Sequence, residues 1–470
     1  MVAQGSQFVF QIAGTVILAR LLTPTDFGLV AMVSVIVAFG KLLRDAGLST
    51  AVVQRQTITQ GQCSTLFWAN VGLSLLLGGC VALAAPAIAR FYDQPELTLL
   101  VIGLAIPLAI GGLATQHSAL LRRNMMFGAM ALAQVGHQAA YFVGAVILAL
   151  LGFGYWSLAG ASFFSALADV LLTFFTCRWL PSWPKRGTGA VSLMRFGGDV
   201  LGFNVLNYFS TNADNILVGR FLGPNPLGLY SRAYNFFALP MVQVRNPIAR
   251  VGLPALRLLV DEPGRYRKYF AKIVNIVATL SFPMGMICVV EGAFLIEVLL
   301  GDQWVGATPV FRILGAAMMI QPAVATLGLV QLSFGESRRY LVWGCVTAVV
   351  YVASFAAGLP WGIAGVAGVY ALANYLLLLP SAAYCLARSP VQVRVFLGAL
   401  VVPFAVSAAA GGLALLTNRL AAPGLLGEGL GLAVFVLVYC GLSLARPSVR
   451  ATLRLLPWLP QRKKRGGLGS

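Results

Sequence analysis

The chain has 470 residues, of which 59% are hydrophobic and 10% are charged, and its formal net charge is +19. Soluble domains carry about 25% charged residues, so this composition excludes an ordinary soluble protein and indicates an integral membrane protein. A basic balance also suits nucleic-acid binding. Here, however, most basic residues flank apolar runs, as in membrane proteins, and we expect no nucleic-acid partner.

The apolar runs predict fourteen membrane spans and hence an all-α integral membrane fold. A spanning helix needs about 20 apolar residues, and Pro, Gly and charged residues separate the runs. The predicted spans are 4–22, 27–43, 64–89, 97–120, 126–151, 154–177, 196–222, 228–250, 269–300, 307–333, 340–358, 362–387, 394–416 and 425–446.

A duplicated motif divides these spans into two halves. Residues 19–31 read ARLLTPTDFGLVA and residues 219–231 read GRFLGPNPLGLYS, each between two apolar runs. Internal repeats of this kind are typical of transporters. The motif follows span 1 and span 7, so each half has six spans. An even number starts both halves on the same side of the membrane. The sequence therefore predicts two six-helix lobes related as parallel repeats, with two further helices after them.

The predicted organisation is an N-lobe over residues 1–178, a cytoplasmic linker over 179–195, a C-lobe over 196–390, two further spans within 391–448 and a basic cytoplasmic tail over 449–470. Basic residues on alternate loops place both termini in the cytoplasm. In the longest cytoplasmic connection, about 250–272, leucines alternate with Arg and Lys, which predicts an interfacial amphipathic helix.

Further motifs join the repeat in a recognisable order. They are DAGLSTAVVQR at 45–55, APAIARFYDQPEL at 85–97, GFGYWSL at 152–158, NADNILVGRFLGPNPLGLYSRAY at 212–234 and LLGDQW at 299–304. As a set they resemble the polysaccharide-export (Wzx-type) flippases of the MOP (multidrug/oligosaccharidyl-lipid/polysaccharide) superfamily. The resemblance implies a two-lobed, MATE-like carrier of the bacterial inner membrane. Its substrate would be an undecaprenyl-pyrophosphate-linked oligosaccharide repeat unit for exopolysaccharide, capsule or O-antigen synthesis. The lipid bilayer and the polysaccharide polymerase and ligase machinery are the other expected partners.

Polar residues inside spans are the candidates for substrate binding, because they are costly in a membrane and mark functional sites. Span 7 is the most polar, and its stripe faces the equivalent stripe of span 1 in our interpretation. The cavity candidates are Asn204, Asn207, Thr211, Asn212, Asp214 and Asn215 of span 7, with Gln7 and Gln11 of span 1. The alternative is that both stripes only bond neighbouring helices.

Arginines near span ends are the candidates for the pyrophosphate. Arg232 lies about one turn into span 8, and a cavity-facing role and a structural pair both stay open. Arg122 and Arg123 end span 4 on the predicted cytoplasmic side, as loading residues or as membrane anchors. Arg20 and Arg220 sit at helix ends, where a cation complements the C-terminal dipole, and we expect a structural role for both.

For coupling to H⁺ or Na⁺ the candidates are the intramembrane acids Asp214, Asp169 and Glu291, with pairing to an arginine as the alternative. The chain has seven cysteines without metal-ligand spacing and two histidines, so we expect no metal and no cofactor. No nucleotide-binding loop is present, and we expect no catalytic residue. The alternatives are an ion-coupled small-molecule antiporter of the multidrug-extrusion group and a polyprenyl-lipid glycosyltransferase.

Overall fold

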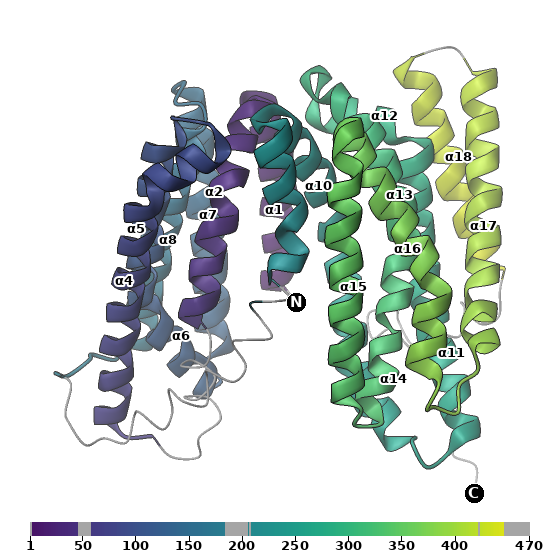
Figure 1. The fold of residues 1–470 in the computed structure, drawn as a ribbon, viewed down its shortest axis with the longest axis horizontal. Coiled ribbons are helices and arrows are strands. Elements are labelled where there is room, and N and C mark those ends of the chain that lie inside the picture. The colour runs from purple at the N-terminus through teal and green to yellow at the C-terminus, as the bar shows by residue number, and fades with distance from the viewer. Residues whose placement is uncertain (1, 46–57, 184–204, 206–207, 422–423, 446–470) are drawn as a thin grey trace, which may run out of the picture. The chain divides into compact units, whose positions relative to one another are not determined.

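The computed structural model describes residues 2–45, 58–183, 205, 208–421 and 424–445, and within these the chain is helical without strands (Figure 1). The helices are α1 (Val2–Leu21), α2 (Pro24–Asp45), α4 (Gln60–Tyr92), α5 (Leu97–Ile110), α6 (Gly112–Arg123), α7 (Phe127–Leu150), α8 (Trp156–Cys177), a helix over 208–222, α10 (Pro224–Leu258), α11 (Pro263–Val290), α12 (Gly292–Leu300), α13 (Thr308–Ala325), α14 (Leu327–Ser333), α15 (Ser337–Gly358), α16 (Gly362–Leu386), α17 (Val393–Leu420) and α18 (Leu425–Leu444). Short 3₁₀ turns, η1 (Asp302–Ala307) and η2 (Leu359–Trp361), connect two pairs of helices.

In the described residues, helices coincide with the predicted spans in chain order, which confirms the all-α membrane fold. Residues 196–204 and 206–207 of the predicted seventh span lie outside the described residues. Ten segments of the described chain are long and apolar enough to cross a membrane by length and composition. The count of fourteen crossings and the cytoplasmic position of the termini stay predictions. Three spans differ in detail. The span predicted at 97–120 is interrupted at Gly111, the one at 269–300 at Glu291 and the one at 307–333 at Thr326.

The segment near 250–272 does not form a separate helix. α10 continues without a break to Leu258, and α11 begins five residues later at Pro263. Leu256 is fully buried in a cluster with Tyr266 and Phe270, so this part of the chain packs into the protein core. The alternation of leucine with basic residues therefore reflects one buried face of a long helix.

Two compact units make up the chain. The first comprises Met1–Ala238, Ile296–Val310 and Gly344–Ala373, and the second comprises Leu239–Leu295, Phe311–Trp343 and Asn374–Ser470. In the first unit α7 packs against both α1 and α8, and α4 packs against α2, α5 and α6. The predicted lobe limits at residues 178 and 390 stay a prediction.

The two copies of the duplicated motif meet in the first unit. α2 and α10 both begin at the proline of their copy, where a proline costs no helical hydrogen bond. A Cβ atom on Gly28 would lie 1.8 Å from the carbonyl oxygen of Pro224, and one on Gly228 would lie 1.8 Å from that of Pro24. This reciprocal contact puts both helix starts at the same end of the bundle. Parallel repeats require such an arrangement, and inverted repeats would separate the two starts across the membrane.

A segment of the second half secures the same junction. The indole Nε1 of Trp304, in η1, donates to the carbonyl oxygen of Ala19 at 2.7 Å, and Gln303 Nε2 donates to the same oxygen at 2.6 Å. Ala19 lies in the last turn of α1, where carbonyl groups lack helical partners. Trp304 is fully buried, and its ring lies 5.5 Å from that of Phe27 in α2.

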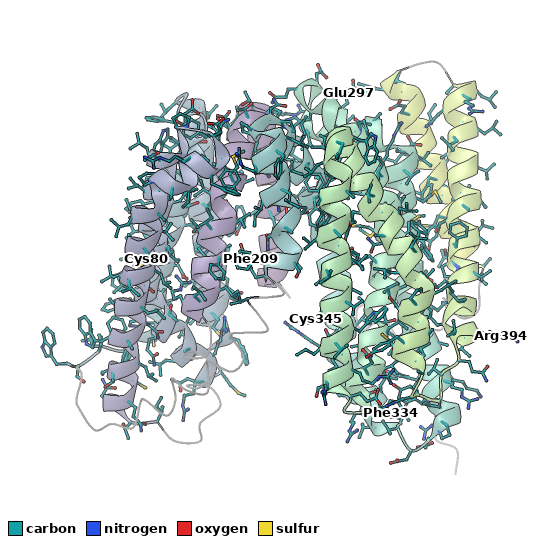
Figure 2. The ribbon with its side chains drawn as sticks, viewed as in Figure 1. Cys80, Phe209, Glu297, Phe334, Cys345 and Arg394 are labelled. Carbon is teal, nitrogen blue, oxygen red and sulfur yellow. The ribbon has the colours of Figure 1, made fainter. Side chains whose placement is uncertain are left out.

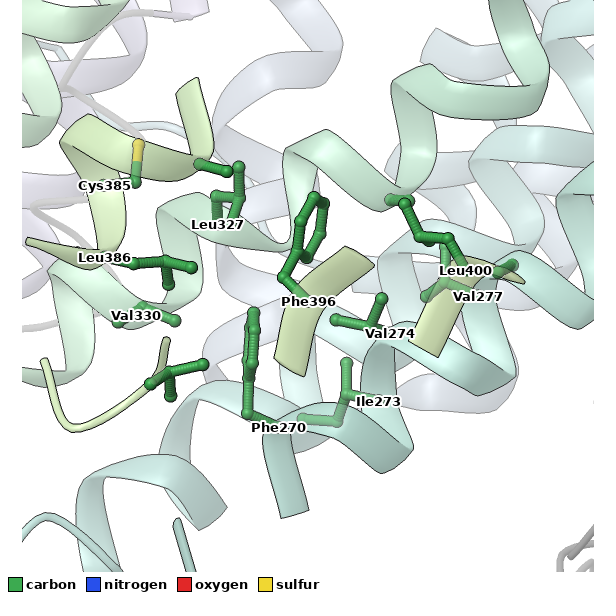
Figure 3. Packing of buried hydrophobic residues seen from close by; sticks show 14 of the residues in the cluster. Phe270, Ile273, Val274, Val277, Leu327, Val330, Cys385, Leu386, Phe396 and Leu400 are labelled. Carbon is green, nitrogen blue, oxygen red and sulfur yellow. The ribbon is translucent and has the colours of Figure 1, made fainter. Parts of the chain in front are cut away.

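The second unit has its own hydrophobic core, which Figure 3 shows from close by. Phe270 and Val274 of α11, Val330 of α14, Leu386 of α16 and Phe396 of α17 pack together there, and each is buried. The core accounts for the length and apolar character of α11 and α17, which pack against each other.

Candidate functional site

The polar stripe predicted on span 7 is described in part. Asn204 and Asn207 lie outside the described residues, and the side chain of Gln7 is likewise not described. In the helix over 208–222, Asn212 Nδ2 donates to the carbonyl oxygen of Tyr208 at 2.9 Å and Thr211 Oγ1 donates to the same oxygen at 3.1 Å. These two side chains therefore use hydrogen-bonding capacity on their own helix, although Thr211 also remains exposed.

Asp214 connects this helix to α10. Its carboxylate is 3% exposed, and it accepts hydrogen bonds from the Tyr230 hydroxyl at 3.0 Å and from the backbone N–H of Asn215 at 2.8 Å. No basic side chain forms an ion pair with Asp214 within the described parts of the chain. Both oxygens thus have protein donors, which favours a structural role for this carboxylate.

Asn215 and Gln11 are both half-buried. The Oδ1 atom of Asn215 is buried and has no hydrogen-bond partner among the described residues. A buried amide oxygen without a donor is costly and is characteristic of a site that a ligand or water completes. Asn215 therefore has capacity left for a ligand.

Arg232 lies where three helices of the first unit meet. Its guanidinium carbon is 3.6 Å from the centroid of the Phe27 ring of α2, and the group interacts electrostatically with Tyr141 of α7. The side chain is half-buried. The contact with Phe27 holds one face of the guanidinium, while its N–H groups, which lie in the plane, remain suited to a phosphate or carboxylate.

The two arginines of the duplicated motif have different partners. Arg20 Nη2 donates to the carbonyl oxygen of Val298, near the end of α12, at 2.6 Å. Arg220 instead lies over the ring of Phe91, near the end of α4, with its guanidinium carbon 5.8 Å from the centroid. The Arg20 contact agrees with the structural role expected from the sequence.

A second polar group lies on α2, α7 and α8 of the first unit, where Lys41 is exposed and the other members are half-buried. His137 of α7 lies with Nδ1 3.4 Å from the Ser165 hydroxyl of α8, and it interacts electrostatically with Asp169 of α8 and Lys41 of α2. Asp169, one of the predicted coupling residues, is half-buried. The sequence gives no sign that Lys41 belongs to this group, because Lys41 lies on another helix, α2, and no spacing along the chain relates it to His137.

Glu291 lies in the second unit, at the break between α11 and α12. It is 1% exposed, and Asn418 Nδ2 of α17 donates to its two carboxylate oxygens at 3.0 and 3.1 Å. The Asn418 Oδ1 atom is buried without a partner among the described residues. This contact joins the end of α17 to the break between α11 and α12.

Arg122 and Arg123 end α6, where cations complement the C-terminal helix dipole. Arg122 is exposed and Arg123 is half-buried. The structure therefore brings the candidates into separate groups. Asp214, Asn215 and Arg232 lie on two connected helices, Asp169 belongs to the His137 group, and Glu291 belongs to another unit. Among the described residues no three His, Cys, Asp or Glu side chains are grouped so as to hold a metal ion.

Comparison with known proteins places these observations in context. A family model described as "Polysaccharide biosynthesis protein" matches residues 17–309. The teichuronic acid biosynthesis protein TuaB of Bacillus subtilis (strain 168) is 26% identical over 422 residues, which cover 86% of this chain and 84% of the relative. The succinoglycan biosynthesis transport protein ExoT of Rhizobium meliloti (strain 1021) is 30% identical over 346 residues, covering 73% and 69%.

Among solved structures, "Lipid II flippase MurJ, inward closed conformation" is similar in fold. The TM-score is 0.76 at 11% sequence identity, and the match covers 96% of this chain and 99% of that chain. At this level of identity the likeness shows the fold, and it confirms the architecture predicted from the repeat.

Proposed function

Since the chain belongs to the family of polysaccharide biosynthesis proteins, we propose that it is a flippase for undecaprenyl-pyrophosphate-linked oligosaccharide repeat units. The family match over residues 17–309 carries this proposal. It includes both copies of the duplicated motif and every residue that contacts Arg232. The proposed location is the bacterial inner membrane, with both termini in the cytoplasm, and the glycan would serve exopolysaccharide, capsule or O-antigen synthesis.

The geometry supports a carrier that changes access to a site between its two repeats. The reciprocal contact of Gly28 and Gly228 closes the bundle at one end through backbone atoms alone. Interfaces of this type have two arrangements, packed or parted, and a substrate that binds one arrangement better shifts the population toward it. The proposed site lies along the helix over 208–222 and α10, at Asn215 and Arg232.

Arg232 would bind the pyrophosphate or an acidic group of the glycan. Its planar group matches two phosphate oxygens at once, and Phe27 fixes its orientation. Asn215 Oδ1 would accept a hydrogen bond from a sugar hydroxyl, since no described residue donates to it. Thr211 is exposed on the same helix, and its hydroxyl is a further group that could bond to the sugar.

We further propose that a proton bound at the group of His137 and Asp169 provides coupling. His137 interacts electrostatically with Asp169, and a carboxylate and an imidazole that lie near each other inside a membrane protein can share a proton. Lys41 adds a positive charge nearby. Replacing Asp169 with Asn should remove the pH dependence of flipping and leave protein abundance unchanged. A pH profile identical to that of the wild type would refute this assignment.

The family relationship favours transport over the two alternatives, since the matched relatives are named for polysaccharide biosynthesis and transport. A deletion strain tests the proposal. Lipid-linked repeat units should accumulate in the cytoplasmic leaflet, where an impermeant glycan-oxidising reagent cannot reach them in intact spheroplasts. If the accumulated sugars react from the outside as fully as in lysed cells, the protein is not the flippase.

A further inference from the structure

An apolar cavity of about 370 Å³ lies between α2, α4 and the helix over 208–222 in the first unit. Its walls are Val35, Ile36 and Phe39 of α2, Ala87, Ile88, Phe91 and Tyr92 of α4, and Phe209 and Ile216 of the third helix. Figure 2 labels Phe209 on this helix. Cavities with such linings do not hold water and bind apolar ligands instead.

One end of the cavity is bounded by contacts between two helices, and one side of the cavity is open. Phe39 lies with its ring centroid 5.0 Å from that of Phe209 and 5.7 Å from that of Tyr208, and the Tyr208 hydroxyl donates to the backbone carbonyl of Val35. These contacts hold α2 and the helix over 208–222 together at this end of the cavity. Phe209 is 44% exposed and Phe91 is 47% exposed, so the cavity is open at the surface of the first unit. An apolar chain could enter the cavity from that side.

A cation lies at the other end of the cavity. Phe209, Ile216 and Arg220 follow one another at spacings of seven and four residues, so they share one face of their helix. The guanidinium of Arg220 rests over the ring of Phe91, which is itself a wall of the cavity. Arg220 is exposed and donates no hydrogen bond to any residue that the structure describes. An apolar cavity with a cation at its end fits a lipid with a phosphate head group.

The contrast with Arg20 strengthens this interpretation. The two arginines occupy the same position in the two copies of the motif. Arg20 donates to the carbonyl oxygen of Val298, whereas Arg220 is exposed and its guanidinium lies over the ring of Phe91. A stacked guanidinium keeps its N–H groups available for bidentate binding of phosphate. The arginine of the first copy therefore stabilises the fold, and the arginine of the second copy is placed to bind a ligand.

We infer that this cavity binds part of the polyprenyl chain of the lipid-linked glycan, with Arg220 on its phosphate. The inference rests on the proposed flippase function. The cavity lies between the first half of the repeat, α2 and α4, and the second half, the helix over 208–222. A lipid that the protein transports must pass between the two halves of the repeat, whereas a phospholipid of the surrounding bilayer need not. With the predicted orientation, the Arg220 end faces the outer leaflet, so the cavity holds the lipid as it leaves.

A photo-cross-linking experiment tests the site in the purified full-length protein. Benzoylphenylalanine replaces Ile216, and undecaprenyl phosphate is added together with a tenfold excess of phosphatidylglycerol before irradiation and intact-mass analysis. The adduct should be predominantly undecaprenyl phosphate. The matched control places the same residue at Leu83, which is 84% exposed on α4 and is not a wall of the cavity. At Leu83 the two lipids should form adducts in proportion to the amounts added.

Two substitutions sharpen the result. Arg220→Gln should reduce the undecaprenyl phosphate adduct by about tenfold, the loss expected for a charge-assisted hydrogen bond, while Arg419→Gln, at another exposed helix end, should not. Ile88→Trp should fill the cavity and reduce the adduct and glycan export at normal protein abundance. Leu83→Trp should change neither.

An adduct at position 216 that follows the lipid ratio, or one that Arg220→Gln leaves unchanged, would overturn the inference. The deletion strain separates this failure from failure of the proposed function. Lipid-linked glycan trapped inside, without a specific adduct, refutes the cavity and retains the flippase. A specific adduct in a protein whose deletion leaves the glycolipid sidedness unchanged refutes the flippase.

Discussion

Replacing Gly28 with Ala should open the junction between the two repeats. The added Cβ atom would lie 1.8 Å from the Pro224 carbonyl oxygen and 2.5 Å from its carbon, whereas ordinary contacts begin at 3.4 Å. α2 and α10 must therefore part by about 1.6 Å at this point, because neither contact atom is a flexible side chain. Overpacking of this kind costs about 1–3 kcal/mol, which shifts the population of the closed junction by roughly fivefold to 150-fold.

Disulfide cross-linking measures that shift directly. Asn225 Nδ2 donates to Thr25 Oγ1 at 3.3 Å across the junction, so cysteines at these two positions should cross-link rapidly in membranes. In the Gly28→Ala background the rate should fall by about tenfold or more, and glycan export should fall with it. Gly72→Ala on α4 is the control, because a Cβ atom there meets nothing within 4 Å. An unchanged cross-linking rate in Gly28→Ala, or an equal loss in Gly72→Ala, would refute the reasoning.

Three further predictions concern single residues. Arg232→Ala should abolish glycan export at normal protein abundance, and Arg232→Lys should restore only part of it, since Lys lacks the bidentate fork. Arg20→Ala should reduce export because less protein accumulates, which immunoblots measure. The reverse pattern would exchange the functional and structural roles of the two arginines. Asp214→Ala should lower the midpoint of thermal unfolding, because it leaves the Tyr230 hydroxyl without its acceptor at a cost of about 1–3 kcal/mol. Asp214→Asn should recover stability and export, and an inactive but stable Asn variant would assign the charge a role in transport. An impermeant thiol reagent should label a cysteine at Asn225 from outside but not one at Arg338, and labelling at both would overturn the predicted topology.

The fold was predictable because its signals are local or repeated. Apolar runs of spanning length gave the helices, and the two motif copies indicated the parallel relation before any contact was known. The reciprocal packing of Gly28 and Gly228 was beyond the sequence, because a glycine shows neither which backbone approaches it nor how closely. Leu256 illustrates the opposite error, since a leucine among basic residues has the same pattern on a membrane surface and on a buried helix face.

The candidate site was predictable in composition and less so in arrangement. The polar character of span 7 was visible, but the bonds of Asn212 and Thr211 to their own helix depend on rotamers that the pattern does not determine. The His137 group brings together side chains from three helices, so no spacing along the chain contains it. Arg20 and Arg220 show the limit most clearly. Identical positions in a repeat acquired different partners, because the segments that reach them differ in sequence.

The most direct test of the central claim is flipping by the purified protein in liposomes. Lipid-linked glycan extracted from the deletion strain is incorporated on both leaflets, and an impermeant glycan-oxidising reagent reports the outer fraction with time. Wild-type protein should make nearly all of the glycolipid reactive, and the Arg232→Ala variant should leave about half of it protected, as in protein-free liposomes. Protection that persists with active, correctly folded wild-type protein would contradict the account.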